Sequence, residues 1–145
     1  MKINAKLHCG IKALIELAKS SDPNGLRQKD IALKQDISVK FLDQIVNSLK
    51  VAGLIYRIGG KKSGGYKLTK DPSEITIYDI YKAFEPELNI NPCLLDSTIC
   101  QRSPTCGAHC FLSEFNLEMK NFMLSHTLHG LIDLEVAKEL ELENS

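Results

Sequence analysis

Apolar residues in the first third of the chain recur with the period of an α-helix. Over residues 4–19 they fall every three or four positions, which predicts one amphipathic helix, and the turn-forming run Asp22-Pro23-Asn24-Gly25 ends it. A shorter helix is predicted over residues 28–35. Ser38 is a favourable N-cap residue, so a third helix is predicted from there to about residue 51.

The third predicted helix has one apolar face and one polar face. Two short helices joined by a tight turn, the second of them polar on its outer side, are typical of the helix-turn-helix, which places its second helix in the DNA major groove. Gln44 and Asn47 can pair with adenine edges, and Lys40 with guanine or phosphate. The positions expected to face DNA are Ser38, Lys40, Asp43, Gln44 and Asn47.

Two β-prone segments follow at residues 54–58 and 66–68. The loop between them, Gly-Gly-Lys-Lys-Ser-Gly-Gly at residues 59–65, predicts a flexible cationic hairpin tip, or wing. Lys61 and Lys62 would contact phosphates or the minor groove, and Tyr66 is expected beside them in the DNA-binding set. A phosphate-binding P-loop is disfavoured because its residue order is absent and the loop leads into a strand. The predicted fold is mainly α, a winged helix-turn-helix with a small β-hairpin wing.

The second half of the chain predicts a short helix at residues 75–84 that packs on the winged domain, and a long helix from residue 107 to about 125. Pro92 and Pro104 are expected to keep the segment between them from becoming helical. The long helix is apolar on more than one face, so it needs two surfaces to bury it. We expect a second subunit's identical helix to supply one of them, with burial inside one chain as the alternative. Its apolar positions are Ala108, Phe111, Leu112, Phe115, Met119, Phe122 and Met123.

Charge is distributed unevenly although the formal net charge is zero. Residues 1–75 hold 14 Lys/Arg against 7 Asp/Glu, and residues 76–145 hold 4 against 11, which favours a polyanion-binding module joined to another unit. There is no run of about 18 apolar residues, so no membrane span is expected. We expect a DNA-binding domain at 1–85, a cysteine-rich loop at 86–106, a dimerisation helix at 107–130 and an acidic, fraying tail at 131–145.

Soft metal ligands are concentrated between residues 93 and 110, where four of the five cysteines and one of the four histidines lie. Cys93, Cys100, Cys106 and His109 follow the spacing C-x6-C-x5-C-x2-H, and Cys110 comes directly after. Three explanations are usual for such a stretch: a disulfide framework, a structural zinc ion or an iron–sulfur cluster.

Disulfides are disfavoured because lysines interrupt the first 20 residues, which have no signal-peptide core, and a cytosolic chain keeps its thiols reduced. Zinc sites usually show short paired C-x2-4-C knuckles. The wider spacing here favours a loop around an iron–sulfur cluster. Three thiolates would hold it, together with a histidine, a fourth thiolate or an outside group.

Residues 48–68, with the wing run Gly64-Gly65-Tyr66, residues 75–85 and the three-cysteine loop resemble the Rrf2 family of bacterial winged-helix regulators. The resemblance covers the chain to about residue 133. It implies a homodimer that binds double-stranded DNA at palindromic operators and carries a 2Fe–2S or 4Fe–4S cluster, which aerobically prepared protein can lack. Cys93, Cys100, Cys106 and His109 match the ligand layout of the family's cluster-assembly regulators. A cytoplasmic transcriptional regulator without a catalytic site is therefore expected.

The chain departs from the family's pattern in two places. One extra residue separates Cys93 from Cys100. In the wing, Gly59 stands where many members have an arginine that contacts the minor groove, so Lys61 or Lys62 would make that contact instead.

Two residues rival His109 as the fourth ligand. Cys110 adjoins it, and His8 lies where the nitric-oxide-sensing branch takes a ligand from the partner's first helix, although an ordinary half-buried helix residue is the simpler interpretation. Three functions stay open: a cluster-sensing transcription factor, a regulator of the same fold with thiol sensing or structural zinc, and an enzyme. Cluster status, redox state or nitric oxide would be the signal for the first. The enzyme is disfavoured because no cysteine outside the loop has a clear base partner.

Overall fold

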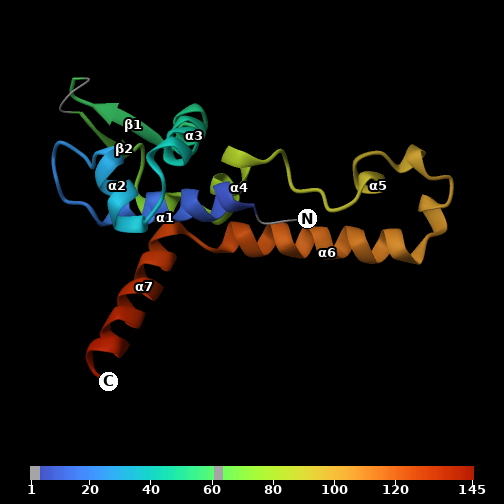
Figure 1. The fold of residues 1–145 in the computed structure, drawn as a ribbon. Coiled ribbons are helices and arrows are strands. Elements are labelled where there is room, and N and C mark those ends of the chain that lie inside the picture. Colours follow the sequence, from blue (N-terminus) through green and yellow to red (C-terminus); the bar gives the residue numbers. More distant parts are fainter. Residues whose placement is uncertain (1–3, 61–63) are drawn as a thin grey trace.

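The computed structural model describes residues 4–60 and 64–145 and opens with a small helical domain. Helices α1 (Ala5–Lys19), α2 (Gln28–Gln35) and α3 (Val39–Val51) pack together, and strands β1 (Ile55–Ile58) and β2 (Gly65–Leu68) form an antiparallel pair (Figure 1). The predicted mainly α winged helix-turn-helix fold is confirmed. The three helices have the bounds that the apolar pattern predicted, to within about one residue.

Local signals set where these helices begin. The Asn4 side chain accepts a hydrogen bond from the Leu7 amide at 2.8 Å, and the Ser38 hydroxyl accepts one from the Phe41 amide at 3.2 Å, so each caps its helix. Asp36, with φ of 52°, turns the chain between α2 and α3. The apolar faces then meet in one core, whose largest fully buried members here are Leu14, Ile31, Leu42, Ile45 and Leu49.

The turn before α2 joins the hairpin and gives the wing a fixed base. Leu26 and Tyr66 form an antiparallel bridge, with their backbone N–H···O distances at 2.9 and 3.0 Å. Gly25 has φ of +76°, and a Cβ there would lie 2.7 Å from the Tyr66 carbonyl oxygen, so only glycine fits this turn. The wing-tip lysines Lys61 and Lys62 lie outside the described residues.

Helix α4 (Ile77–Phe84) covers the helical domain. Thr76 and Asp79 form a capping box, with backbone-to-side-chain distances of 3.0 Å in both directions. Tyr78, Ile80 and Tyr81 are buried, so α4 completes the core rather than lying on its surface.

The segment 86–106 contains short helical turns, α5 (Pro92–Leu95), η2 (Ser97–Ile99) and η3 (Ser103–Thr105). The prediction that its prolines exclude helix was wrong. Proline occupies the first turn of both α5 and η3, where its missing N–H would have no intrahelical partner in any case.

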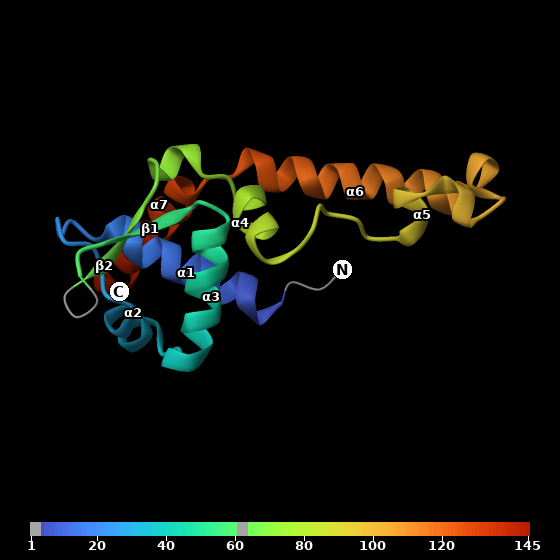
Figure 2. The same ribbon diagram turned by 90° about the horizontal axis from the view of Figure 1, so that it is seen from above.

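Helix α6 (Gly107–Ser125) is the longest element and runs away from the winged domain, with the cysteine-rich segment beside its far end in both views (Figures 1 and 2). A separate helix, α7 (Leu128–Glu143), follows. The acidic tail expected at 131–145 falls largely within α7, and its fraying stays a prediction. Thr127 caps α7 through the Gly130 amide at 3.2 Å, and Lys19 on α1 pairs with Glu135 at 3.8 Å and Glu139 at 3.4 Å.

The link between α6 and α7 is joined to the start of α4 by backbone pairing. Thr76 and Thr127 form an antiparallel bridge, in which the Ile77 amide donates to the His126 carbonyl and the Leu128 amide to the Ile75 carbonyl, each at 2.9 Å. Leu128 and Met123 are buried in the same core as the winged domain. This pairing fixes the direction in which α6 leaves the domain.

Close packing of α1 on α4 gives a stability prediction. A Cβ at Gly10 would lie 2.5 Å from the Phe84 ring. Gly10→Ala should therefore destabilise the fold by about 1–3 kcal/mol, despite the better helix propensity of alanine. Urea unfolding at fixed protein concentration measures this.

Gly130→Ala is the matched control, because the nearest atom to its Cβ is the Thr127 hydroxyl oxygen at 3.7 Å. It should stabilise α7 by about 0.5–1 kcal/mol. A Gly10→Ala variant as stable as the parent would contradict the close α1–α4 contact.

Candidate DNA-binding face and cysteine site

The polar face of α3 is open to solvent. Lys40, Gln44 and Asn47 are all exposed, while Leu42, Ile45, Val46 and Leu49 fix the opposite face in the core. Exposed amide and ammonium groups on a helix that follows a tight turn are the arrangement with which helix-turn-helix proteins contact bases. Their exposure is compatible with DNA contact, which stays a prediction for all three.

Three other predicted DNA-contacting side chains are already engaged. The Asp43 carboxylate accepts a hydrogen bond from the Gln28 amide of α2, and the Ser38 hydroxyl caps α3. The Tyr66 side chain is only 8% exposed and belongs to the core, so it supports the base of the wing rather than presenting a surface to DNA. Its position opposite the Leu26 turn, which the pattern of the isolated strand does not reveal, explains this burial.

Sequence reasoning overlooked Arg57 as a candidate. It lies exposed on β1, and its guanidinium donates to the Gly60 carbonyl at 3.4 Å within the wing. Arg57 is therefore a further candidate for DNA contact beside Lys61 and Lys62, and its position in the β-prone segment that leads into the wing was the available signal.

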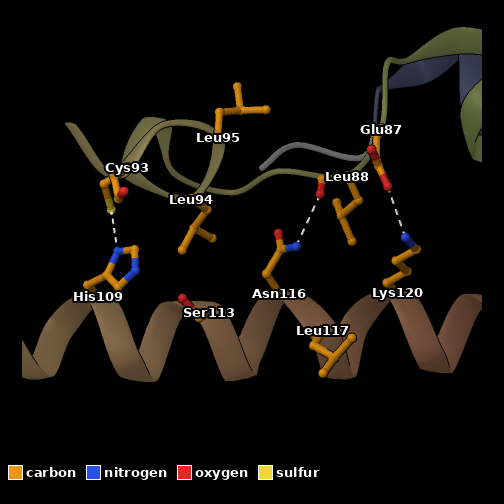
Figure 3. Close-up of a pocket in the computed structure, with 11 residues that line it drawn as sticks. Glu87, Leu88, Cys93, Leu94, Leu95, His109, Ser113, Asn116, Leu117 and Lys120 are labelled. Carbon is orange, nitrogen blue, oxygen red and sulfur yellow. Dashed lines mark hydrogen bonds and ion pairs between the residues drawn. The ribbon is translucent and has the colours of Figure 1, made fainter. Parts of the chain in front are cut away.

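A second region of interest is the extended segment of residues 86–91, which we call the arm, lying along one face of α6 (Figure 3). That face carries polar residues three or four positions apart, so they form one row along the helix. Asn116 binds the arm backbone at Leu88 and Ile90, and Lys120 pairs with Glu87 at 2.9 Å. This hydrogen bond lowers the pKa of the Glu87 carboxyl and raises the pKa of the Lys120 ammonium.

At the far end of the same row, His109 meets the first cysteine. Its Nδ1 lies 3.3 Å from the Cys93 Sγ, and both residues are half-buried (Figure 3). Cys100 is exposed and Cys106 is half-buried. Across residues 4–60 and 64–145 no three Cys, His, Asp or Glu side chains are close enough to hold one metal ion. The structure thus brings together two of the four predicted ligands.

The chemistry of this loop nevertheless suits a soft metal group. Three thiols and an imidazole lie within one segment, and the Ser103 hydroxyl between Cys100 and Cys106 is buried without a hydrogen-bond partner. A buried hydroxyl without a partner is costly, and a thiolate or sulfide drawn into the loop would supply the acceptor that it lacks. The donor set fits an iron–sulfur cluster if Cys100 and Cys106 close on the Cys93–His109 pair.

Neither rival ligand is buried beside this pair. Cys110 is exposed on the first turn of α6, and His8 is exposed on α1. Cys9 is half-buried and packs against the core, as its small apolar side chain predicts.

An apolar groove of about 990 Å³ lies where α1, α4, α6 and α7 meet. Beyond it along α6, Phe111 is 64% and Phe115 46% exposed, and Phe122, which lines the groove, is 66% exposed. Only Met123 of the predicted apolar stripe is buried within the chain, so one surface of α6 has no partner among the described residues. The groove is lined mainly by Leu7, Ile11, Ile77, Met119, Phe122, Met123, Leu131 and Leu134.

These features define a winged-helix DNA-binding protein. The chain matches over residues 3–134 the Rrf2 family model, described as an iron-dependent transcriptional regulator. It belongs to the Rrf2 family and is a DNA-binding transcriptional regulator, a class of proteins that are not enzymes. None of the described helices combines the length and apolar character that crossing a membrane requires.

Named relatives agree with this assignment. The chain is 27% identical over 132 residues to the HTH-type transcriptional regulator IscR of Vibrio campbellii, which covers 91% of this chain and 77% of that protein. Among solved structures it resembles CymR, the global cysteine regulator of B. subtilis, with 28% identity, a TM-score of 0.77 and coverage of 92% and 98%. It also resembles T. potens IscR, with 26% identity, a TM-score of 0.68 and coverage of 97% and 90%.

The exposed face of α3 predicts base-specific contacts. Gln44→Ala should weaken binding to an operator selected from a random-sequence pool by about 1–3 kcal/mol, because a bidentate amide–adenine contact is lost. The loss should vanish on operators changed at the contacted base, which a titration of matched duplexes measures.

Lys138→Ala on α7 serves as the control, since that exposed residue lies on a helix remote from α3. Equal affinity of the Gln44→Ala variant and the parent for every duplex would contradict the docking of α3 in the major groove.

Proposed function

We propose that this regulator acts as a cytoplasmic homodimer on palindromic operators, and that an iron–sulfur cluster in the cysteine loop controls its affinity for DNA. The observation that carries the proposal is the contact between Cys93 and His109, which begins to assemble a ligand set with the spacing of cluster ligands. The family's description as iron-dependent supports it.

Four side chains would hold the cluster: the thiolates of Cys93, Cys100 and Cys106, and the imidazole of His109. When bound, the cluster would supply a group that gains and loses electrons and reacts with oxygen or nitric oxide. The chain's own part is to keep Cys93 over His109 and to bring the other two cysteines in from the exposed loop. Closure would order a segment in which Cys100 is now exposed.

Contacts along the arm link this loop to the DNA-binding domain. Leu88 is 3% exposed, and its amide donates to the Tyr78 hydroxyl of α4 at 3.4 Å. Ordering the loop would therefore act on α4 and on the base of α6 at the same time. Because a dimer reads two half-sites about one helical turn apart, a small shift between the two α3 helices changes affinity.

The dimer itself would form through α6 and the apolar groove at its base. Exposed aromatic side chains on a helix of a small protein mark an interaction surface. Every copy of the chain carries the same surface, so two copies can pair through it about a two-fold axis without any other partner.

A second candidate function is thiol sensing without a cluster, or a structural zinc ion in its place. Cys100 and Cys110 are exposed thiols, and the resemblance to a global cysteine regulator supports this alternative. Exposed thiols react readily with oxidants. Reconstitution with iron and sulfide distinguishes the two functions, because only a cluster-binding protein takes up both.

Cluster binding predicts a spectroscopic result. Anaerobic reconstitution with iron and sulfide should give charge-transfer absorption in the parent, and serine at Cys93, Cys100 or Cys106 should abolish it, because each substitution removes a soft thiolate ligand. His109→Ala should weaken the cluster without removing all iron.

Cys9→Ser is the matched control, since Cys9 packs against the core of the helical domain. His8→Ala and Cys110→Ser test the rival fourth ligands. Zinc in the purified protein, with neither iron nor sulfide after reconstitution, would contradict the proposed cluster and favour thiol sensing or a structural zinc ion.

Dimerisation is tested at Phe115, which is exposed in the single chain and can be changed without opening the core. Phe115→Asp should weaken the dimer by about a hundredfold or more, because one apolar ring per subunit would no longer be buried. Sedimentation equilibrium measures this, and operator affinity should fall in parallel.

Leu142→Asp, at the exposed end of α7, is the control. If the Phe115→Asp protein stays dimeric, Phe115 is not part of the interface. The proposal that Met119 and Phe122 contribute to the same interface then fails as well.

A further inference from the structure

Both polar groups of the Asn116 side-chain amide form hydrogen bonds with the arm. Its Nδ2 donates to the Leu88 carbonyl at 3.1 Å, and its Oδ1 accepts from the Ile90 amide at 3.0 Å. The two backbone groups lie two residues apart, so the amide pairs with the arm as the edge of a neighbouring strand would. This part-buried pair of bonds suits an amide, whose planar group holds one donor and one acceptor side by side and so matches a backbone C=O and N–H two residues apart.

Other contacts of the arm do not fix its position as closely. The Glu87–Lys120 pair is exposed, and exposed ion pairs contribute little. Leu88 is buried, yet an apolar contact tolerates sliding that two directed hydrogen bonds do not. Because Leu88 also donates to Tyr78 of α4, the point that Asn116 holds is the point where the arm leaves the winged domain.

The spacing on both sides explains why the first cysteine meets the histidine. His109 lies seven residues before Asn116, two turns along the same face of α6 and about 10 Å along its axis. Cys93 lies three residues after Ile90, and three residues span at most about 10 Å. With Ile90 held on Asn116, the short link to Cys93, which lies in the first turn of α5, places the Cys93 Sγ 3.3 Å from the His109 Nδ1.

We propose that Asn116 is the positioning residue of the cysteine site: it sets the register of the arm on α6 and so brings Cys93 to His109 before any metal binds. The importance of this register for cluster uptake rests on the proposed function, whereas the register itself does not.

A cross-linking experiment on the metal-free protein tests the register. His109→Cys is combined with serine at Cys9, Cys100, Cys106 and Cys110, and the pair formed by Cys93 and the new thiol is treated with a short bifunctional reagent that fluoresces only when both arms react. Asn116→Asp keeps the size of the side chain but sets a carboxylate oxygen against the Leu88 carbonyl. The initial rate of cross-linking should fall about tenfold, the effect of losing one hydrogen bond and adding repulsion.

Asn121→Asp is the matched control, because it makes the same change at an exposed position on the same helix, and its rate should equal that of the background protein. Asn116→Ala, which adds no repulsion, is the second variant and should give a smaller decrease. The urea unfolding midpoint and the DNA affinity of the metal-free Asn116 variants should be unchanged, which separates lost register from lost fold.

Equal cross-linking rates in the Asn116→Asp and Asn121→Asp proteins would overturn the proposal. A lower rate accompanied by general unfolding of Asn116→Asp is resolved by Asn116→Ala, which must then show the decrease in a folded protein or the proposal fails.

In the chain with its natural cysteines, Asn116→Asp should also take up less iron and sulfide than Asn121→Asp. If the parent takes up neither, the proposed cluster fails while the cross-linking result still decides the role of Asn116.

Discussion

The bridge between Thr76 and Thr127 is the constraint on which the arrangement of this protein depends. Each threonine also caps a helix, Thr76 for α4 and Thr127 for α7, so one short backbone pairing aligns the starts of two helices and the end of a third. Met123 and Leu128 on either side are buried in the winged domain's core. Together with the burial of Met123, this pairing sets the direction of α6 and so the place of the cysteine segment and the apolar groove.

The sequence predicted those parts of the fold that local signals control. Ser38 caps α3 and Gly25 makes its turn as expected, because capping and positive φ depend on the residue itself. Burial of Tyr66 depends on Leu26, far away in the chain, and the position of α7 depends on the burial of Leu128 in the core of the winged domain. Such contacts leave no period in the sequence, so those two features were missed or misjudged.

The cysteine site was predictable in its chemistry but not in its geometry. Thiol spacing identified the donor set, since ligands supplied by one loop are visible as a motif. The role of Asn116 could not be predicted from the sequence, because a single polar residue on a helix has many ordinary roles. Its partners Leu88 and Ile90 also lie 28 and 26 residues away. The Cys93–His109 contact follows from that distant pairing, and Cys100 and Cys106 remain candidates from the motif alone.

The length of α6 has a mechanical consequence. Between His109, beside the cysteine segment, and Met123, in the core, the helix rises about 21 Å at 1.5 Å per residue. If α6 moves as a rigid rod, it turns about the bridge between Thr76 and Thr127. A rotation of about 5° at the bridge moves the far end by about 2 Å, a little over one third of the helical pitch. Conversely, a displacement of a few ångströms at the cysteine end corresponds to a rotation of only several degrees at the domain. In the proposed mechanism, a large local rearrangement of the cysteine segment would therefore cause only a small change in the orientation of α3.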